Sequence, residues 1–147
     1  MKSEPESYSI ADLKKEKRTG WSGVRNYQAR NFMQSMAVGD LVIFYHSNAA
    51  PPGAAGVAKV VKTAYPDPTA FDAKDHHFDP KSNPEKPTWH QVDVAHVATF
   101  KEFVPLDALK EDKKLSGLLL TSGKAMQLSV QPLSKPHFDR IVALGKS

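Results

Sequence analysis

Two β-type segments joined by a tight turn constrain the fold of this chain most strongly. Residues 41–46 form a continuous apolar run, which is typical of a strand buried on both faces. The turn Pro51-Pro52-Gly53 follows, and residues 56–64 have the composition of a second strand, antiparallel to the first. A third segment, residues 88–103, alternates apolar and polar side chains over an unusual length. The sequence therefore predicts an antiparallel sheet at the centre of the fold.

Helix signals bracket these strands. A serine-aspartate capping pattern predicts a short helix over residues 10–16, and the polar residues up to Gly20 are expected to form a loop. A longer helix is expected to begin after the N-cap Ser22 and to stop at Gly39, because apolar residues recur between them at helical spacing. The remaining expected elements are an extended segment at 2–5, a helical turn within the proline-rich loop 66–87, a short helix at 105–110, a short strand at 128–130 and a closing helix at 134–144.

Length and composition limit the class of protein. With 147 residues and 40% hydrophobic side chains, the chain suits one core, so we expect a single domain over residues 1–147. Strands joined by hairpins and flanked by helices predict an α+β fold whose sheet curls into a small barrel. The chain has no cysteine, which excludes disulfides and thiolate zinc sites. It also lacks an apolar run long enough to span a bilayer, so we expect no membrane partner and a cytoplasmic location, or a nuclear one in a eukaryote.

The net charge is a weak indicator of partners. A formal charge of +4 fits attraction to a polyanion, but many basic proteins bind nothing acidic. Two segments, residues 21–30 and 44–48, are more specific indicators. Both are rich in aromatic and polar residues, and each lies at the end of an expected helix or strand. Binding pockets with hydrogen-bonding specificity are usually assembled at such places.

Nine segments of the sequence are similar to those of a known family. In chain order these segments are Lys2-Ser3-Glu4-Pro5, Trp21-Ser22-Gly23-Val24-Arg25-Asn26-Tyr27-Gln28-Ala29-Arg30, Gly39-Asp40, Phe44-Tyr45-His46-Ser47-Asn48, Tyr65-Pro66-Asp67, Ala70-Phe71-Asp72, Asp79-Pro80-Lys81-Ser82, Val92-Asp93-Val94 and Leu128-Ser129-Val130-Gln131-Pro132. Together they resemble the EVE domain family over essentially the whole chain. The resemblance implies a PUA-like fold, which is a small β-barrel flanked by helices. EVE domains are related to the YTH readers of methylated adenine in RNA, so the resemblance also implies a module that binds a modified base in DNA or RNA.

Three departures from the family pattern concern the site. The chain begins one residue before the Lys-Ser-Glu-Pro motif, whereas relatives usually carry a few more residues there. Either the first strand is shortened in this chain or the start codon was placed late. Gln127 stands where relatives often have an arginine, which puts a phosphate contact there in doubt. The family is more often tyrosine-rich at His76-His77-Phe78, so an aromatic wall from this loop could differ.

Trp21 is the expected stacking surface. A base taken out of its stack needs a flat aromatic partner, which contributes about 1–3 kcal/mol. Trp21 precedes the predicted helix and occupies a position that resembles the first tryptophan of the YTH cage. We therefore expect its ring to be half-open at the lip of the barrel, so that Trp21→Ala would leave the melting temperature nearly unchanged. The alternative is that Trp21 simply plugs the end of the core.

Arg25 and Asn26 are expected near the same opening. In a helix that begins at Ser22 they share a sector with the apolar face, so both point to the rim of the core. Arg25 then either pairs internally with Glu4 or Asp72 or waits for a ligand phosphate. Asn26 offers a donor and an acceptor to a base edge, and backbone N–H groups at the helix start would attract an anion.

Other residues complete the expected site. For Ser47 and Asn48 turn chemistry is an equally good interpretation, and His46 fits a satisfied core histidine better than a catalytic one. The expected ligand-binding residues are Ser3, Glu4, Trp21, Val24, Arg25, Asn26, Tyr45, Ser47, Asn48, Phe71 and Asp72, and the expected phosphate contacts are Lys2, Arg30, Lys81 and Lys124.

Catalysis and metal binding have little support in the sequence. Asp75, His76, His77 and Asp79 could coordinate a metal, but they lie in a proline-rich loop without visible supporting groups, so we expect no metal and no cofactor. Neither a phosphate-binding glycine loop nor a nucleophile elbow is present. The sequence thus predicts a non-enzymatic reader of a modified base, and a monomer is favoured. An enzyme acting on a nucleotide or small metabolite in the same pocket and a protein-interaction scaffold are the alternatives.

Overall fold

The computed structural model of the protein describes residues 1–122 and 128–146. A five-stranded sheet runs through them in the order β1-β3-β4-β5-β2. β1 is parallel to β3, and the other neighbouring pairs are antiparallel. The strands are β1 (Lys2–Ser3), β2 (Arg18–Gly20), β3 (Leu41–His46), β4 (Gly53–Pro66) and β5 (His90–Pro105). The predicted antiparallel pairing of β3 with β4 is confirmed.

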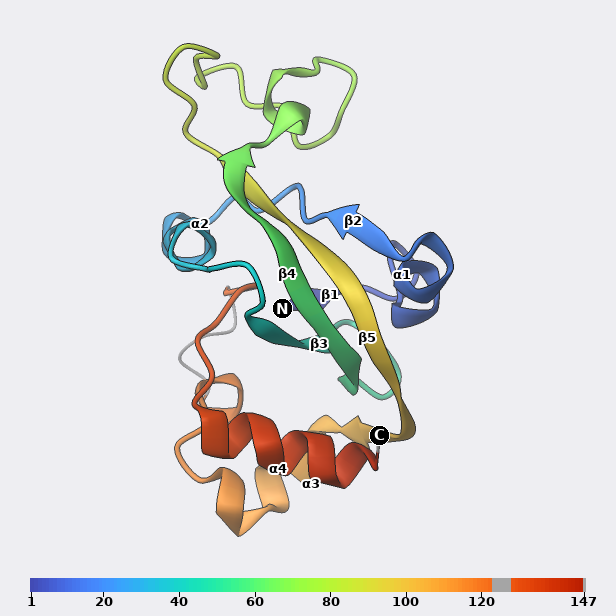
Figure 1. The fold of residues 1–147 in the computed structure, drawn as a ribbon. Coiled ribbons are helices and arrows are strands. Elements are labelled where there is room, and N and C mark those ends of the chain that lie inside the picture. The colour runs from blue at the N-terminus through green and yellow to red at the C-terminus, as the bar shows by residue number, and fades with distance from the viewer. Residues whose placement is uncertain (123–127, 147) are drawn as a thin grey trace.

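Helices flank the sheet at several places (Figure 1). α1 and α2 lie on either side of the upper part of the long β4–β5 ribbon, and α3 and α4 lie together at its lower end. The helices are α1 (Ile10–Glu16), α2 (Tyr27–Gln34), α3 (Leu106–Glu111) and α4 (Lys135–Gly145), with short 3₁₀ turns η1 (Pro68–Phe71), η2 (Lys113–Leu115) and η3 (Leu119–Thr121). This arrangement confirms the α+β, PUA-like class. Within the described ranges the sheet keeps β1 and β2 as its two ends and does not close, so it is a barrel only loosely.

Side chains of β3 divide between two hydrophobic clusters. Val42 and Phe44 belong to the first cluster, with Trp21 and residues of α1 and α2. Ile43 and Tyr45 belong to the second, with residues of α3 and α4. Because successive side chains of a strand point to opposite faces, one apolar run supplies both clusters. β3 is therefore buried on both faces, as predicted.

Local sequence signals placed most boundaries correctly. Ser9 caps α1 in a capping box with Asp12, and the helix ends at Glu16 as expected. Ser134 caps α4, and its side chain accepts a hydrogen bond from the backbone of His137. In these helices the cap and the apolar face lie within one short segment, so the sequence contains the whole signal.

Three predicted elements are wrong. Residues 18–20, expected in a loop, form β2, because their backbone pairs with β5 at the edge of the sheet and polar side chains suffice there. The second helix begins at Tyr27, not after Ser22, because Asn26 is the cap and its Oδ1 accepts the Ala29 N–H at 3.0 Å. It also ends at Gln34, with Ser35 as the C-cap, and does not continue to Gly39. Residues 128–130 form no strand, and Ser129 contributes one backbone bond, from the Lys2 N–H.

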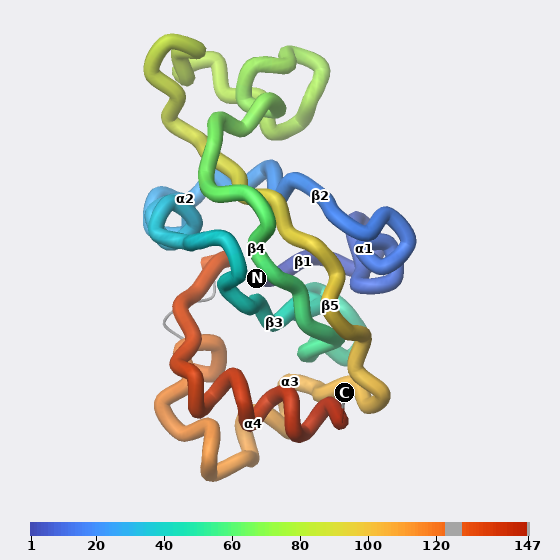
Figure 2. Tube along the Cα trace, viewed as in Figure 1, coloured from blue at the N-terminus to red at the C-terminus, as the bar shows by residue number. Residues whose placement is uncertain are grey.

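The segment between β4 and β5 extends beyond the sheet (Figure 2). It is the long proline-rich loop of the sequence, with η1 near its start. It lies beside the ends of the two long strands and the chain leading into α2, and its last residues contact α2, where Arg30 donates to the Thr88 carbonyl. No helix of the described residues is both long and apolar enough to cross a membrane.

His46 should make stability depend on pH. Its Nε2 accepts the Ile10 N–H at 3.1 Å, a bond that needs the neutral ring, and burial lowers the pKa of His46 below its ordinary 6.5. The unfolded chain then binds a proton that the folded chain does not, so stability is full above pH 6.5 and falls below it, by at most about 1.4 kcal/mol per pH unit.

Thermal unfolding between pH 7.5 and 5 tests this expectation. The wild type should lose more stability over that range than His46→Asn, whose amide oxygen can accept the same bond without titrating. Equal losses in the two proteins would show that other groups carry the pH dependence.

Candidate ligand-binding cleft

A cleft of about 550 Å³ opens between the N-terminal strand, the segment from β2 to α2 and the loop that follows η1. Its size falls within the range of about 300–1,000 Å³ found for small-molecule sites. Its lining is Lys2, Ser3, Glu4, Ser7, Tyr8, Thr19, Gly20, Trp21, Ser22, Gly23, Val24, His76, His77 and Ser129.

Trp21 lines this cleft but is buried rather than half-open at its lip. Its side chain and backbone together are 8% exposed, and its ring meets that of Phe44 edge to face, with centroids 5.4 Å apart at 84°. The backbone N–H of Trp21 donates to the Val92 carbonyl at 2.8 Å, which fixes this part of the chain beside β5. The expectation of a half-open ring is wrong, because the ring is part of the first hydrophobic cluster. A cleft nevertheless adjoins it, since Trp21 is among the residues that line the cleft.

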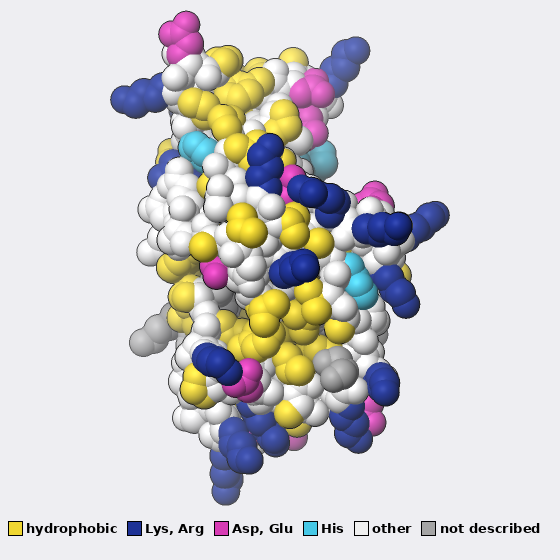
Figure 3. Space-filling view, viewed as in Figure 1, with side chains coloured by type: hydrophobic (Ala, Val, Ile, Leu, Met, Phe, Trp, Pro, Cys, Tyr) yellow, Lys and Arg dark blue, Asp and Glu magenta, His cyan; other side chains and the backbone are white. Residues whose placement is uncertain are grey.

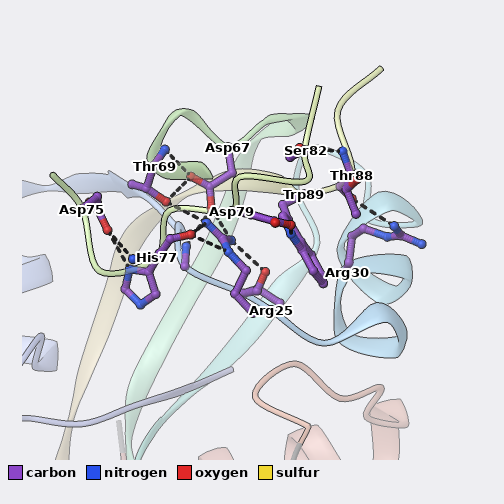
Figure 4. Close-up of polar contacts among 12 residues, drawn as sticks. Arg25, Arg30, Asp67, Thr69, Asp75, His77, Asp79, Ser82, Thr88 and Trp89 are labelled. Atoms are coloured by element: carbon purple, nitrogen blue, oxygen red, sulfur yellow. Dashed lines mark hydrogen bonds and ion pairs between the residues drawn. The ribbon is translucent and has the colours of Figure 1, made fainter. Parts of the chain in front are cut away.

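Arg25 fastens the cleft wall to the long loop (Figure 4). Its guanidinium pairs with the fully buried Asp67 at 3.0 Å and donates to Thr69 Oγ1 at 3.1 Å. Nε and one terminal nitrogen also donate to the His77 carbonyl, at 2.9 and 2.7 Å, and the other donates to the Val24 carbonyl. These contacts use all five N–H groups of the guanidinium.

The role expected for Arg25 therefore needs correction. Its carboxylate partner is Asp67 rather than Glu4 or Asp72, and no N–H group is left for a ligand phosphate. The helical geometry assumed for Arg25 and Asn26 is also wrong, since both precede the first residue of α2. The bracing interpretation of Arg25 fits its contacts.

Asp67 joins both sides of this arrangement. Its Oδ2 accepts the Gly23 N–H at 2.8 Å as well as Arg25, and its Oδ1 accepts two bonds from Thr69. Burial raises the pKa of Asp67, but the bonds from Thr69, Gly23 and Arg25 outweigh burial and leave the pKa below its usual value. The Gly23 N–H, expected to attract a ligand anion, is thus already bound to a carboxylate.

Gly23 is required by the close approach of His77. A Cβ atom at Gly23 would lie 2.8 Å from the His77 ring, and Gly23 has φ +81°, which favours glycine. His77 is held in turn by Asp75, whose Oδ1 accepts the His77 backbone N–H at 2.8 Å. The loop and the segment before α2 therefore form one continuous wall.

Two titratable groups of the cleft have shifted pKa values. Burial and a hydrogen bond donated to Glu16 raise the pKa of Tyr8 to about 12, so its phenol stays protonated near neutral pH. Burial lowers the pKa of Lys2. Ser3 donates its hydroxyl to the Tyr8 carbonyl at 2.7 Å, which orients the N-terminal side of the cleft.

The structure brings together only part of the expected site. Five of the predicted residues line the cleft: Lys2, Ser3, Glu4, Trp21 and Val24. Lys124 lies outside the described residues. The predicted residues that do not line this cleft are Arg25, Asn26, Arg30, Tyr45, Ser47, Asn48, Phe71, Asp72 and Lys81.

The end of β3 is displaced from the cleft for simple geometric reasons. Phe44 faces Trp21, so the next side chain, Tyr45, points to the opposite face, where it is buried in the second cluster. Asn48 has φ +48° and donates its amide to Glu4 at 2.8 Å, and Ser47 donates its backbone N–H to Ser3. The turn interpretation fits this pair, although Asn48 also orients a residue that lines the cleft.

Phe71, Asp72 and Lys81 lie in the long loop away from the cleft. Asp72 accepts the Lys74 N–H in a local turn, and the Lys81 N–H donates to Asp79 in a similar one. Short acidic side chains commonly stabilise loops in this way. Their sequence motifs therefore shape the loop that carries His77.

Three loop residues could hold a cation. Ligand atoms of Asp75, His76 and His77 all lie within 4.8 Å of one another. Asp79, the fourth residue of the sequence pattern, accepts the Trp89 Nε1–H at 2.7 Å instead. The His76 side chain is 85% exposed, so the group has the chemistry but not the enclosure of a built metal site.

Basic side chains do not form a stripe on the face that Figure 3 shows. Lysines and arginines are scattered around it, with acidic side chains among them. A scattered charge attracts a polyanion only generally and is weakened by salt. The charge on this face therefore gives no basis for selectivity.

Sequence reasoning missed several residues of the cleft. Ser7 and Tyr8 lie two and three residues after the Lys-Ser-Glu-Pro motif, and Ser22 lies inside the tryptophan motif, so their neighbours gave a usable signal. Thr19 and Gly20 lie on the unrecognised edge strand. His77 is far from Trp21 in sequence, and tertiary contacts such as those of Arg25 with its carbonyl bring it to the cleft.

Comparison with known proteins gives one consistent result. A family model described as "EVE domain" matches residues 1–144. Thymocyte nuclear protein 1 of Gallus gallus is 44% identical over 163 residues, which cover 98% of this chain but 66% of that protein, so the chain spans just under two-thirds of that relative's length.

Two solved structures are similarly close. A hypothetical protein from Leishmania major has a TM-score of 0.95 at 46% identity and covers 99% of this chain and 92% of its own. The human THYN1 protein in complex with 5-methylcytosine-containing DNA has a TM-score of 0.93 at 42% identity, over 100% of this chain and 96% of its own. The names of the vertebrate relatives do not support the expected cytoplasmic location, and the location of this chain stays a prediction.

Proposed function

This chain belongs to the EVE domain family, and from that premise we propose that it binds nucleic acid by holding one modified base in the cleft beside Trp21. The human relative captured with DNA that contains 5-methylcytosine supports DNA as the polymer and 5-methylcytosine as the first base to test. RNA binding and a monomeric state stay predictions, as does a single domain over residues 1–147.

The observation that carries the proposal is the cleft itself. Its lining includes Trp21, whose ring we infer to face a ligand, and the hydroxyl-bearing residues Ser3, Ser7 and Ser22, at a volume suited to a small planar ligand. An extruded base needs an aromatic or apolar surface and hydrogen-bonding partners for its edge. The contacts of Arg25 and Asp67 fix the wall that follows Trp21, and the serines of the N-terminal segment lie on the other side of the cleft.

Binding without catalysis fits the chemistry of the cleft better than proton transfer does. Tyr8, with its pKa raised to about 12, is a poor general base near neutral pH. The pair of Asp75 and His77, with ring nitrogen and carboxylate oxygen 3.2 Å apart, is the feature that favours the alternative of an enzyme. A nucleic-acid ligand recovered unchanged after long incubation would support the reader, and a base-modified or cleaved product would support the enzyme.

Filling the cleft should abolish selective binding. Thr19 is half-buried in the cleft lining, and its backbone pairs with β5 opposite Val94, so Thr19→Phe adds bulk while the strand pairing is kept. We expect its affinity for an oligonucleotide with one 5-methylcytosine to fall by at least about tenfold, which corresponds to ~1.4 kcal/mol. Fluorescence anisotropy at fixed salt, with methylated, hydroxymethylated and unmodified oligonucleotides, single-stranded and duplex, measures this.

The matched control is Thr63→Phe, the same substitution at an exposed position of β4 outside the cleft. It should bind as the wild type does. The proposal fails if the wild type binds modified and unmodified oligonucleotides equally, or if Thr19→Phe keeps its preference while its melting temperature is normal.

A further inference from the structure

Tyr27 presents an exposed aromatic ring next to the cleft wall. The residue is 61% exposed, yet its ring is held in place by stacking on Trp89, with centroids 5.1 Å apart and planes 24° from parallel. Trp89 is buried and anchored through its Nε1–H, which donates to Asp79. A rigid ring with an open face differs from an ordinary surface tyrosine, because little side-chain entropy is lost when a ligand stacks on it.

Arg30 gives this place an unneutralised positive charge. Arg18, Arg25 and Arg140 each pair with an aspartate. Among residues 1–122 and 128–146, Arg30 has no carboxylate partner, and it donates to two neutral oxygens, the Thr88 carbonyl and Asn31 Oδ1. Its guanidinium is thus positioned without being neutralised, which is the state a phosphate-binding arginine needs.

The position of Arg30 leaves the outer face of Tyr27 open. Its Cζ lies 5.0 Å from the Tyr27 centroid and 6.0 Å from that of Trp89. If Arg30 covered the outer face of Tyr27, it would be nearly twice as far from Trp89 as from Tyr27. It therefore lies beside the two stacked rings, with Tyr27 still able to receive another flat group.

This aromatic and basic surface lies close to the cleft. Val24, which lines the cleft, is three residues before Tyr27, so the two Cα atoms are at most about 11 Å apart. Arg25 lies 5.4 Å from the Trp89 ring and holds the His77 carbonyl, and Figure 4 shows Trp89 between Arg25 and Arg30. A nucleotide beside a bound base can reach this distance.

We propose that Tyr27 and Arg30 form a second subsite, which takes the nucleotide flanking the modified base, with its base stacked on Tyr27 and its phosphate paired with Arg30. The proposal rests on the proposed function of the cleft and adds where the strand continues. It predicts that the protein reads a modified base within a single-stranded or locally opened segment, because a base can stack on Tyr27 only when it is not stacked in a duplex.

Two ligands separate the subsites. The nucleoside 5-methyl-2′-deoxycytidine fills the cleft alone, and a single-stranded oligonucleotide with one central 5-methylcytosine fills both subsites. Tyr27→Leu keeps apolar cover over Trp89 but removes the aromatic face. We expect it to weaken oligonucleotide binding by about 5- to 150-fold and to leave nucleoside binding unchanged. Tyr27→Phe, which keeps the aromatic face, should bind the oligonucleotide as the wild type does.

Arg30 is tested by salt dependence. Arg30→Gln should make the slope of log affinity against log salt for the oligonucleotide shallower, by the contribution of about one phosphate contact. The affinity for the nucleoside should not change. Lys135→Gln removes the same charge from an exposed side chain of α4 and should leave the slope unchanged. Phe103→Ala, an exposed aromatic residue at the far end of β5, is the control for Tyr27→Leu.

The outcomes distinguish this inference from the function on which it rests. If the wild type does not prefer 5-methyl-2′-deoxycytidine to deoxycytidine, the proposed function of the cleft fails. If it has that preference but Tyr27→Leu and Arg30→Gln bind the oligonucleotide as their controls do, the cleft stands and the second subsite is refuted. In that case Tyr27 serves only to cover Trp89.

Discussion

Replacing Asp67 with asparagine should lower the free energy of unfolding by about 3–5 kcal/mol and abolish ligand binding. The carboxylate is completely buried, and its Oδ2 accepts bonds from both Gly23 and Arg25. An asparagine amide has one acceptor oxygen and one donor nitrogen, so two of these donors lose their partner and the Arg25 charge is no longer neutralised. For a chain of this size the loss corresponds to roughly 6–20 °C in Tm.

Binding should fail together with stability because Asp67 fixes the cleft wall. Through Gly23 and Arg25 it holds the segment after Trp21, and Arg25 in turn holds His77. Since the pKa of Asp67 is lowered in the folded protein, its contribution is present above its ordinary pKa of 3.8 and is lost as the pH falls further.

Urea unfolding at pH 7 measures the Asp67 effect. Asp139→Asn is the control, because it removes an exposed aspartate paired with Lys135, and exposed pairs contribute about 0–1 kcal/mol. An Asp67→Asn protein as stable as this control would contradict the bracing role of the Arg25–Asp67 pair. A destabilised protein that still binds at low temperature would show that the cleft does not depend on this brace.

Trp21→Ala should also cost about 3–5 kcal/mol, because it empties a large volume in the first hydrophobic cluster. The sequence alone led us to expect a nearly unchanged melting temperature, and the burial of the ring and its contact with Phe44 reverse that expectation. Trp21→Phe keeps an aromatic edge against Phe44 at a smaller cost, but it shortens the wall of the cleft. We therefore expect Trp21→Phe to stay folded and to bind a 5-methylcytosine oligonucleotide at least about tenfold more weakly.

Phe100→Ala provides the matched comparison. Phe100 is buried in the second cluster, against Gly145 of α4, so its removal should destabilise the protein to a similar degree while leaving the cleft intact. Binding is measured at a temperature where all variants are folded, as checked by circular dichroism. If Trp21→Phe binds as tightly as the wild type, the indole is only a core residue and the base lies elsewhere.

Elements whose signals are local were predictable from the sequence. α1 was found from the capping pattern of Ser9 and Asp12, and the hairpin of β3 and β4 from an apolar run, a turn and a second run. β2 was not predictable, because an edge strand needs only backbone partners and its sequence carries no hydrophobic alternation. α2 was placed four residues too early, because two possible caps, Ser22 and Asn26, precede it and only one of them is used.

The site was predicted in part for the same reason. Motifs led to Trp21, Val24 and the Ser3-Glu4 pair, all of which line the cleft. Tyr45 was wrongly joined to them, although the alternation of β3 separates it from Phe44 and hence from Trp21. The partner of Arg25 was missed because Asp67 is 42 residues away along the chain.

The sequence by itself determined the α+β class, the family and the segments that carry the site, since these depend on periodicity and motifs within short stretches of chain. The tertiary structure alone decided which of those side chains share a cleft, that Trp21 is a wall and not an open platform, and that Arg25 is used internally. The physical reason is that burial and the pairing of charges depend on what distant segments bring to the same place, and a linear pattern does not contain that information.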